Sequence, residues 1–373
     1  MTPKERVIAA LRHQQPDRVP MGEFAFDHKL IEHYTGKPSY WRPFSNAKAQ
    51  IALWEGKRDM VVESWKEAIV FLAEKVEHDI LAVQLAPSKY KPIEAPRQIA
   101  PDTWETADGN LLKYSPQTES IRPVHDGPAD PPKYDESDFP LTDIEEPDES
   151  EWELVRFAVQ RYGRTHFIAA RSGDGTLVFP GGMENALILM AEKPEVVAAA
   201  IAQASHQALQ MDRLWAREGV DGLAPGADYA MNAGLLFSPK LFERLCYPAI
   251  LQQTALARRL GLYTLKHACG NNWTIMDYLV DGGYDAYQSI QESATMDICK
   301  LKDKYGDRIT LWGGVQVETL VRGTPAEVRQ EVIRAIRYCA PGGGFILGAS
   351  HSIVNATKPA NYDAFLEAWR EYR

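Results

Sequence analysis

From residue 151 to its C-terminus, the chain alternates amphipathic helical segments with short apolar segments bounded by Gly, Pro or polar residues. Helices and strands that alternate in this way form a parallel sheet, and uninterrupted apolar runs are typical of strands covered on both faces. The predicted helices span residues 151–163, 183–217, 239–260, 273–281, 297–304, 325–338 and 359–372. The predicted strands span residues 79–85, 167–171, 222–228, 263–269, 286–290, 309–313 and 344–349, with an eighth near residues 19–21.

The number of strands and the chain length of 373 residues favour one closed barrel over a doubly wound sheet. No Gly-x-Gly-x-x-Gly follows a strand, so no dinucleotide site is expected. The sequence therefore predicts an α/β fold, a (β/α)8 TIM barrel with an N-terminal helical extension and an inserted excursion that contains a hairpin. We expect a single domain over residues 1–373, with a helical cap over residues 1–78.

Residues 86–150 differ from the rest of the chain because they are rich in Pro, Asp and Glu. A hairpin is predicted around residues 107–110, where Ala-Asp-Gly-Asn separates residues 104–106 from residues 111–114. The acidic run at residues 143–149 fits a disordered linker as well. Trp104, Tyr114 and Tyr134 favour instead an excursion that packs over the barrel mouth.

The overall charge excludes some classes of partner. The formal net charge is −10, from 41 Lys and Arg against 51 Asp and Glu, which disfavours nucleic-acid binding. No apolar run is long enough to span a membrane, and the N-terminal residues lack the apolar segment of a signal peptide. Four widely spaced cysteines form no disulfide framework, so we expect a cytoplasmic protein with reduced thiols.

Polar side chains gather where the predicted strands end. In a barrel of this type, the carboxyl ends of the strands carry the chemistry. The candidate site residues at or just after these ends are Arg171, Asp228, His267, Cys269, Gln288, Gln291, Gln316 and His351.

His267 and Cys269 form the strongest local pattern. Side chains two apart on a strand point to the same face, so the imidazole and the thiol can meet at one point. Both are good zinc ligands, but both residue types are also common in cores, and the spacing alone leaves the two interpretations open. A zinc site needs a third protein ligand, which His351 can provide, and Asp228 is the best fourth candidate.

Several segments resemble one known family over nearly the whole chain. They are residues 1–13, 16–20, 236–242, 267–271, 307–315 and 342–347. On these segments the chain resembles the uroporphyrinogen decarboxylase superfamily, and within it the branch that includes cobalamin-dependent methyltransferases. The resemblance implies a (β/α)8 barrel. It also implies a His-x-Cys…Cys zinc site, in which His267 and Cys269 match the first two ligands and His351 lies near the place of the missing last cysteine.

This resemblance implies zinc-dependent methyl transfer between a small substrate and a corrinoid. The chain has no corrinoid-binding Asp-x-His-x-x-Gly motif, so the cofactor is expected on a separate protein. Asp228 and His351 are the candidate catalytic residues. The candidate substrate-binding residues are Arg171, Gln288, Gln291, Gln316, Tyr229 and Trp312. Members of the family are often homodimers, but nothing in the sequence fixes the oligomeric state.

Two other functions remain open. The first is a metal-free decarboxylase or lyase, because His351 also resembles a histidine of the family's decarboxylases, where no metal is involved. Porphyrinogen itself is disfavoured as its substrate, since residues 19–26 lack the arginines that grip its carboxylates and residues 79–86 lack the family's aspartate at the expected place. The second is a non-catalytic barrel that binds a small molecule.

Overall fold

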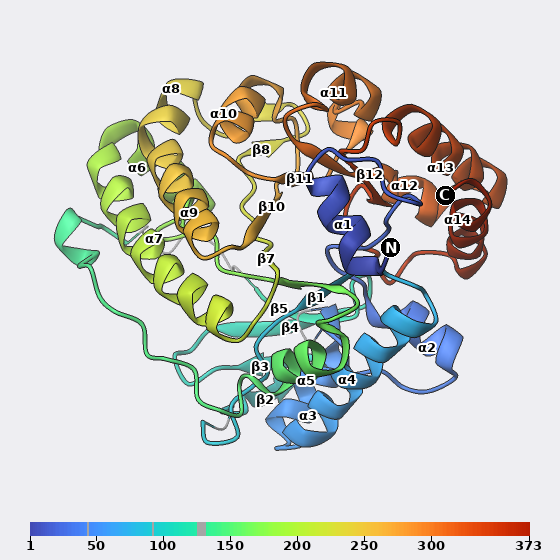
Figure 1. Ribbon diagram of the computed structural model, residues 1–373. Coiled ribbons are helices and arrows are strands. Elements are labelled where there is room, and N and C mark those ends of the chain that lie inside the picture. Colours follow the sequence, from blue (N-terminus) through green and yellow to red (C-terminus); the bar gives the residue numbers. More distant parts are fainter. Residues whose placement is uncertain (43–44, 92, 125–131) are drawn as a thin grey trace.

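The computed structural model describes residues 1–42, 45–91, 93–124 and 132–373 (Figure 1). Its centre is a curled sheet of seven parallel strands with helices around it, which confirms the predicted α/β fold of the TIM-barrel type. In sheet order the strands are β1 (Ile80–Val83), β6 (Phe167–Ala170), β7 (Gly222–Leu223), β10 (Tyr263–His267), β11 (Ala286–Gln288), β12 (Thr310–Val315) and β13 (Phe345–Ala349).

The segment expected to be the eighth strand lies between the two edges of this sheet, but it forms only an isolated bridge. Met21 bridges Leu347 of β13 in parallel, and the N–H of Asp79, just before β1, donates to the carbonyl of Met21 at 2.7 Å. Pro20 has no N–H to donate, and the Met21 N–H is bound by the Asp79 carboxylate at 2.9 Å instead of a carbonyl. The ladder therefore stops after one bridge.

The helices around the sheet follow the predicted segments closely. They are α5 (Glu153–Tyr162), α6 (Met183–Glu192), α7 (Pro194–Arg217), α9 (Tyr247–Arg259), α10 (Met276–Asp281), α11 (Ile298–Tyr305), α13 (Pro325–Cys339) and α14 (Pro359–Tyr372). Start signals explain the agreement: α13 begins with Pro325 after Thr324, whose side chain forms a capping box with Glu327. The predicted helix 239–260 is instead divided into α8 (Pro239–Leu241), a π-helical turn (Phe242–Cys246) and α9.

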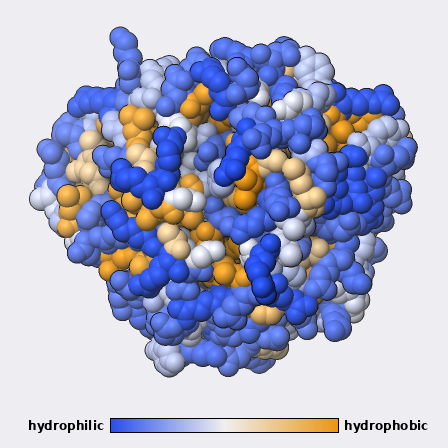
Figure 2. Space-filling model, viewed as in Figure 1, coloured by the Kyte–Doolittle hydropathy of each residue, from blue (hydrophilic) through white to orange (hydrophobic). Residues whose placement is uncertain are grey.

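Helix α1 (Pro3–Leu11) closes the N-terminal end of the barrel. Thr2 and Glu5 form its capping box. The Lys4 N–H donates to Thr165 O at 2.8 Å, and Thr310 Oγ1 donates to Ala10 O at 3.0 Å, both beside the starts of strands. In Figure 1 this dark blue helix lies just right of the centre of the view. The face seen here is largely hydrophilic, with apolar residues in scattered areas (Figure 2).

Three further helices precede β1, and the excursion packs beside them. They are α2 (His28–Thr35), α3 (Ala47–Trp54) and α4 (Arg58–Glu74). The excursion contains an antiparallel sheet of β2 (Arg97–Ala100), β3 (Thr103–Glu105), β4 (Leu111–Ser115) and β5 (Ser120–Pro123). The predicted hairpin is confirmed by the pairing of Glu105 with Leu111. Trp104 contacts Trp54 of α3 with ring centroids 5.7 Å apart.

The expected excursion includes residue 92 and residues 125–131, which lie outside the described part of the chain. A second small hairpin, β8 (Ala230–Met231) with β9 (Gly234–Leu235), follows β7 and was not expected. Within the described ranges, no helix is long and apolar enough to cross a membrane.

Candidate metal centre and ligand cavity

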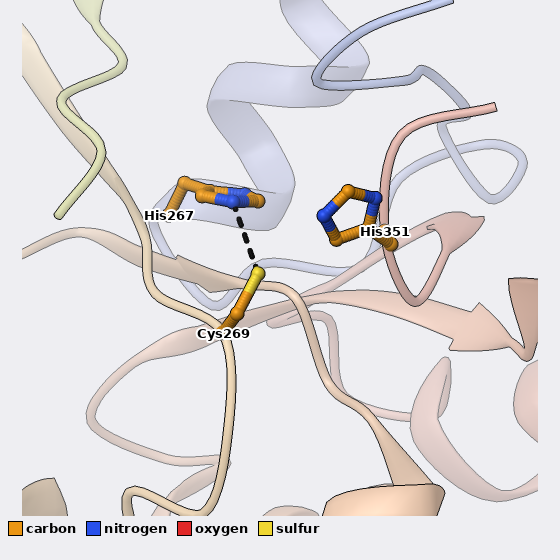
Figure 3. A group of neighbouring side chains, drawn as sticks. All are labelled: His267, Cys269 and His351. Carbon is orange, nitrogen blue, oxygen red and sulfur yellow. Dashed lines mark hydrogen bonds between the residues drawn. The ribbon is translucent and has the colours of Figure 1, made fainter. Parts of the chain in front are cut away.

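Three side chains from two separate strand ends converge at the carboxyl edge of the sheet. His267 is the last residue of β10, Cys269 lies two residues beyond it, and His351 lies two residues beyond β13. One ligand atom of each residue lies within 4.8 Å of those of the other two. Cys269 Sγ is 3.3 Å from His267 Nε2, and the two imidazole rings have centroids 5.8 Å apart (Figure 3).

The loop after β10 brings Cys269 into this group. The predicted strand 263–269 ends at His267, so regular strand geometry does not set the direction of the thiol. Instead, the Cys269 N–H donates to Asp228 Oδ1 at 2.7 Å, and the Gly270 N–H donates to Gln291 Oε1 at 2.9 Å. Gly270 has φ +83°, and a Cβ there would lie 2.4 Å from Ala230 O, so the tight loop needs glycine at this position.

Neighbouring side chains fix the orientation of the His267 imidazole. Its Nδ1 donates to Gln288 Oε1, which can only accept, so Nε2 keeps its lone pair toward Cys269. The Gln288 side chain is itself fixed, since its Nε2 donates to Ala349 O at 3.3 Å. Phe24 stacks on the imidazole with centroids 4.1 Å apart. Burial lowers the pKa of His267 to about 4, so the ring is neutral at physiological pH.

The Cys269 thiol lies in a half-buried, polar environment. Its Sγ is 3.1 Å from Ser289 Oγ, and Ser289 has φ +81°, which is rare for a residue with a side chain. Burial, reinforced by the negative charge of Asp228, raises the pKa of Cys269 to about 12. The thiol therefore keeps its proton unless a cation is bound beside it, because a metal ion reverses this preference.

The donor set fits a zinc ion. Two imidazoles and one thiol are ligands that zinc prefers, and ordinary zinc–ligand lengths at tetrahedral angles place sulfur and nitrogen about 3.5 Å apart. The observed separation of 3.3 Å between Cys269 Sγ and His267 Nε2 agrees with this value. Three protein ligands leave a fourth position for a substrate or water, which is the arrangement of catalytic zinc sites.

A cavity of about 830 Å³ opens beside His267. Asp228 and Arg171 lie in its wall, together with Phe24. Its outer wall comes from the N-terminal helices and the start of the excursion: Leu53, Trp54, Trp65, Lys91 and Ile93. The volume and the mostly apolar lining are typical of sites for small ligands.

The other expected site residues lie in different surroundings. Gln291 and Gln316 bind backbone N–H groups, those of Gly270 and Glu292, so they brace loops at the strand ends. Tyr229 and Trp312 are fully buried, and neither lies in the cavity wall. Trp312 packs inside the barrel, where its Nε1 donates to Gly22 O at 2.9 Å.

Comparison with known proteins assigns the chain to a family. The model of the family described as "Uroporphyrinogen decarboxylase (URO-D)" matches residues 177–372, more than half of the chain. The chain belongs to the URO-D family. Its fold is similar to that of a methyltransferase from Methanosarcina mazei, with a TM-score of 0.70, 16% sequence identity, and coverage of 100% of this chain and 99% of that one.

Curated URO-D relatives match over shorter stretches. The uroporphyrinogen decarboxylase of Psychromonas ingrahamii is 30% identical over 108 residues, which is 29% of each chain. That of Chromohalobacter salexigens is 28% identical over 142 residues, 37% of this chain and 38% of the relative. The matched stretches thus span less than two fifths of the length of these relatives.

The sequence-based predictions missed several residues around the candidate metal centre and the cavity. Ser289 directly follows Gln288 at a strand end, so its position was a usable signal, although its hydroxyl gave no hint of contact with Cys269. Phe24 follows closely on the segment expected as the eighth strand, so its position was a usable signal too. Trp65 gave none, because it lies far from the predicted strand ends in sequence and reaches the cavity through the fold of the N-terminal segment.

Proposed function

We propose that this URO-D family member is a cytoplasmic, zinc-dependent methyltransferase that moves a methyl group between a small substrate and a corrinoid carried by a separate protein. The observation that supports this proposal most directly is the convergence of His267, Cys269 and His351, whose ligand atoms lie within 4.8 Å of one another. A zinc ion held by these three residues would keep a fourth position for a substrate, and the cavity adjoins the group because His267 lies in its wall.

Each residue has a role that its contacts support. His267 and His351 are the neutral nitrogen ligands, since burial lowers the pKa of both imidazoles, and Cys269 is the sulfur ligand. Zinc, when bound, acts as a Lewis acid toward a substrate oxygen or lowers the pKa of a substrate thiol. Asp228 lies beside Cys269 and in the cavity wall, where its carboxylate accepts the proton that a thiol substrate gives up. Gln288 holds His267 in its ligating tautomer.

The chain forms one catalytic unit in this proposal. In this proposal the described parts of residues 1–78 cap the barrel, and the excursion of residues 86–150 reaches its mouth, where Lys91 and Ile93 line the cavity. The corrinoid has to arrive on its partner protein at this mouth, because the sequence carries no Asp-x-His-x-x-Gly motif. A homodimer is compatible with this proposal, because all the candidate site residues of one copy come from one chain.

A metal-free decarboxylase is the second candidate, because the curated relatives are uroporphyrinogen decarboxylases. In that case His351 and Asp228 act as the polar groups of the site. Porphyrinogen fits poorly, since Arg171 and Lys91 are the cations among the described residues that line the cavity, against the many carboxylates of that substrate. A barrel that only binds a small molecule would show neither turnover nor a need for zinc.

Metal content and methyl transfer test the proposal together. Purified protein is expected to hold one zinc per chain by elemental analysis, and the Cys269→Ser and His351→Ala variants are expected to lose most of it. Cys299→Ser is the matched control, because this thiol is half-buried and lies far from the cavity lining. Protein without stoichiometric zinc, together with a Cys269→Ser variant that keeps full methyl-transfer activity, would falsify the zinc mechanism.

A further inference from the structure

Arg171 lies in the cavity wall without a carboxylate partner among the described residues. It directly follows β6, and its N–H continues the strand ladder by donating to Val83 O at 2.8 Å. Its guanidinium is largely buried, and burial lowers its pKa to about 10. Nη1 lies 3.4 Å from Gln84 Oε1, and the buried Nε has no hydrogen-bond partner among the described residues. A buried charge left in this state is costly unless a ligand pairs with it.

The charged groups that influence the pKa of Arg171 do not form an ion pair with it. They are Arg42 and Asp27, and they are paired with each other at 2.6 Å. Asp27 also accepts a hydrogen bond from Ser45 at 2.7 Å. Lys91, the other cation of the cavity wall, is exposed and binds Glu145 on the surface. Arg171 is thus the free cation of the described cavity wall.

The position of Arg171 relative to the metal centre sets the size of the ligand. Its Cζ lies 5.2 Å from the ring centroid of Phe24, and that ring stacks on His267 at 4.1 Å. The ring of Phe24 thus separates the Arg171 guanidinium from the His267 imidazole. A small molecule with one substituted aromatic ring spans the same distance between these two side chains. Part of the wall is aromatic and apolar, with Trp54, Trp65 and Leu53, and this part fits the faces of such a ring. The wall also holds the carboxylates of Asp228 and Glu151, so the carboxylate of a ligand has to lie at Arg171.

We propose that the substrate is an aromatic monocarboxylate, whose carboxylate binds Arg171 while its reacting heteroatom lies at His267, Cys269 and His351. Arginine pairs with a carboxylate through two parallel N–H···O bonds. One free guanidinium matches one negative charge, which disfavours a phosphate dianion. The inference rests on the proposed function for the identity of the reacting end, but not for the binding of the carboxylate.

Calorimetric titration of the full chain with 4-methoxybenzoate and with its neutral counterpart, 4-methoxybenzamide, tests the carboxylate site. The acid is expected to bind at least about tenfold more tightly than the amide, since a charge-assisted hydrogen bond contributes about that factor or more. Arg171→Gln is expected to abolish this preference, and Arg171→Lys is expected to retain part of it. Arg308→Gln is the matched control, because it removes the same charge from an exposed ion pair outside the cavity.

Equal affinity for acid and amide, an acid preference that survives in Arg171→Gln, or no detectable binding of the acid at millimolar concentration would each overturn the inference. The titration needs neither zinc nor a corrinoid protein. Carboxylate-selective binding without methyl transfer would therefore refute the proposed function alone. Methyl transfer from neutral substrates without any preference for a carboxylate would refute this inference alone.

Discussion

The single contact from Gln288 to His267 should decide how tightly the site holds zinc. Gln288→Leu keeps the side-chain size but removes the acceptor for the Nδ1 proton, so the imidazole is free to rotate or change tautomer. Loss of such a contact typically weakens metal binding by roughly 10–100-fold. Competition with a chromophoric chelator measures the change.

Gln316→Leu is the control for that experiment. Gln316 is also buried and also bonds through its side-chain oxygen, but to the Glu292 N–H and not to a candidate ligand. The zinc affinity of the Gln316→Leu variant should stay close to that of the unmodified protein. A Gln288→Leu variant that binds zinc as tightly as the Gln316→Leu variant would mean that packing against Phe24 alone orients His267.

Asp212, on α7, should make stability fall as pH rises. Its carboxylate is fully buried without a described hydrogen-bond partner, and burial raises its pKa from 3.8 to about 7. Between about pH 4 and pH 7 the folded chain keeps this proton, whereas the unfolded chain releases it. The stability that the folded chain has while Asp212 is protonated is therefore full below about pH 4 and is lost as the pH rises through 7. Asp212→Asn should therefore be more stable than the unmodified protein at pH 8, by on the order of a few kcal/mol.

Urea unfolding at pH 5 and pH 8 measures that difference. The neighbouring charges are Asp174, which is paired with Lys266, and Arg213, and they are the same in both proteins. A gap between the two proteins that does not widen with pH would contradict the assignment of the proton to Asp212.

At the level of single residues, the sequence predicted the candidate ligands better than their surroundings. His267, Cys269 and His351 could be found because strand ends converge in a barrel, whatever the details of the loops. Tyr229 and Trp312 were placed in the substrate site by the same argument, yet both are fully buried away from the cavity wall. A position near a strand end does not tell whether a side chain points to the mouth or into the packed interior.

A buried ion pair connects two elements behind the site. Lys266 of β10 pairs with Asp174 in the loop after β6, and both side chains are almost fully buried. Removing one partner leaves an uncompensated buried charge, which typically costs about 3–5 kcal/mol. Lys266→Met should lower the free energy of unfolding by this amount, and the double variant Lys266→Met/Asp174→Asn should recover part of it.

Chemical denaturation provides the measurement, with Arg308→Gln as the comparison. The ion pair of Arg308 with Asp281 is exposed, and such pairs contribute about 0–1 kcal/mol. If Lys266→Met costs no more than Arg308→Gln, the buried pair does not hold the loop after β6 against β10.

Whole elements were predictable where local signals and apolar pattern agree. Helix α14 spans the predicted residues 359–372, with Pro359 at its first position. Strand β7 is far shorter than the predicted 222–228, because Pro225 cannot donate to a ladder and only its carbonyl is used, by the His267 N–H at 2.9 Å. Helix α2 gave no clear signal, since Asp27 before it forms no side-chain cap and pairs with Arg42 instead.

Across the whole molecule, the candidate centre joins parts of the barrel that are not neighbours. His267 and Cys269 belong to β10 and its loop, and His351 follows β13; β11 and β12 lie between these strands. The order of the sheet therefore leaves no backbone ladder between the two ligand-bearing segments. An ion bound by all three residues would link them directly across the barrel mouth.

Zinc should therefore stabilise the folded chain as a whole. Protein stripped with a chelator should unfold at a lower temperature, and zinc should restore the midpoint in a concentration-dependent way, with about 2.7 kcal/mol gained at a free concentration 100 times the dissociation constant. Differential scanning calorimetry measures the shift, and magnesium, which prefers oxygen ligands, should produce none. The shift should vanish in Cys269→Ser and persist in Cys299→Ser, because only the first thiol belongs to the group of three ligands. If zinc raised the unfolding temperature of both variants equally, the stabilising ion would lie elsewhere in the molecule. The stability of the fold would then not depend on the centre that joins β10 to β13.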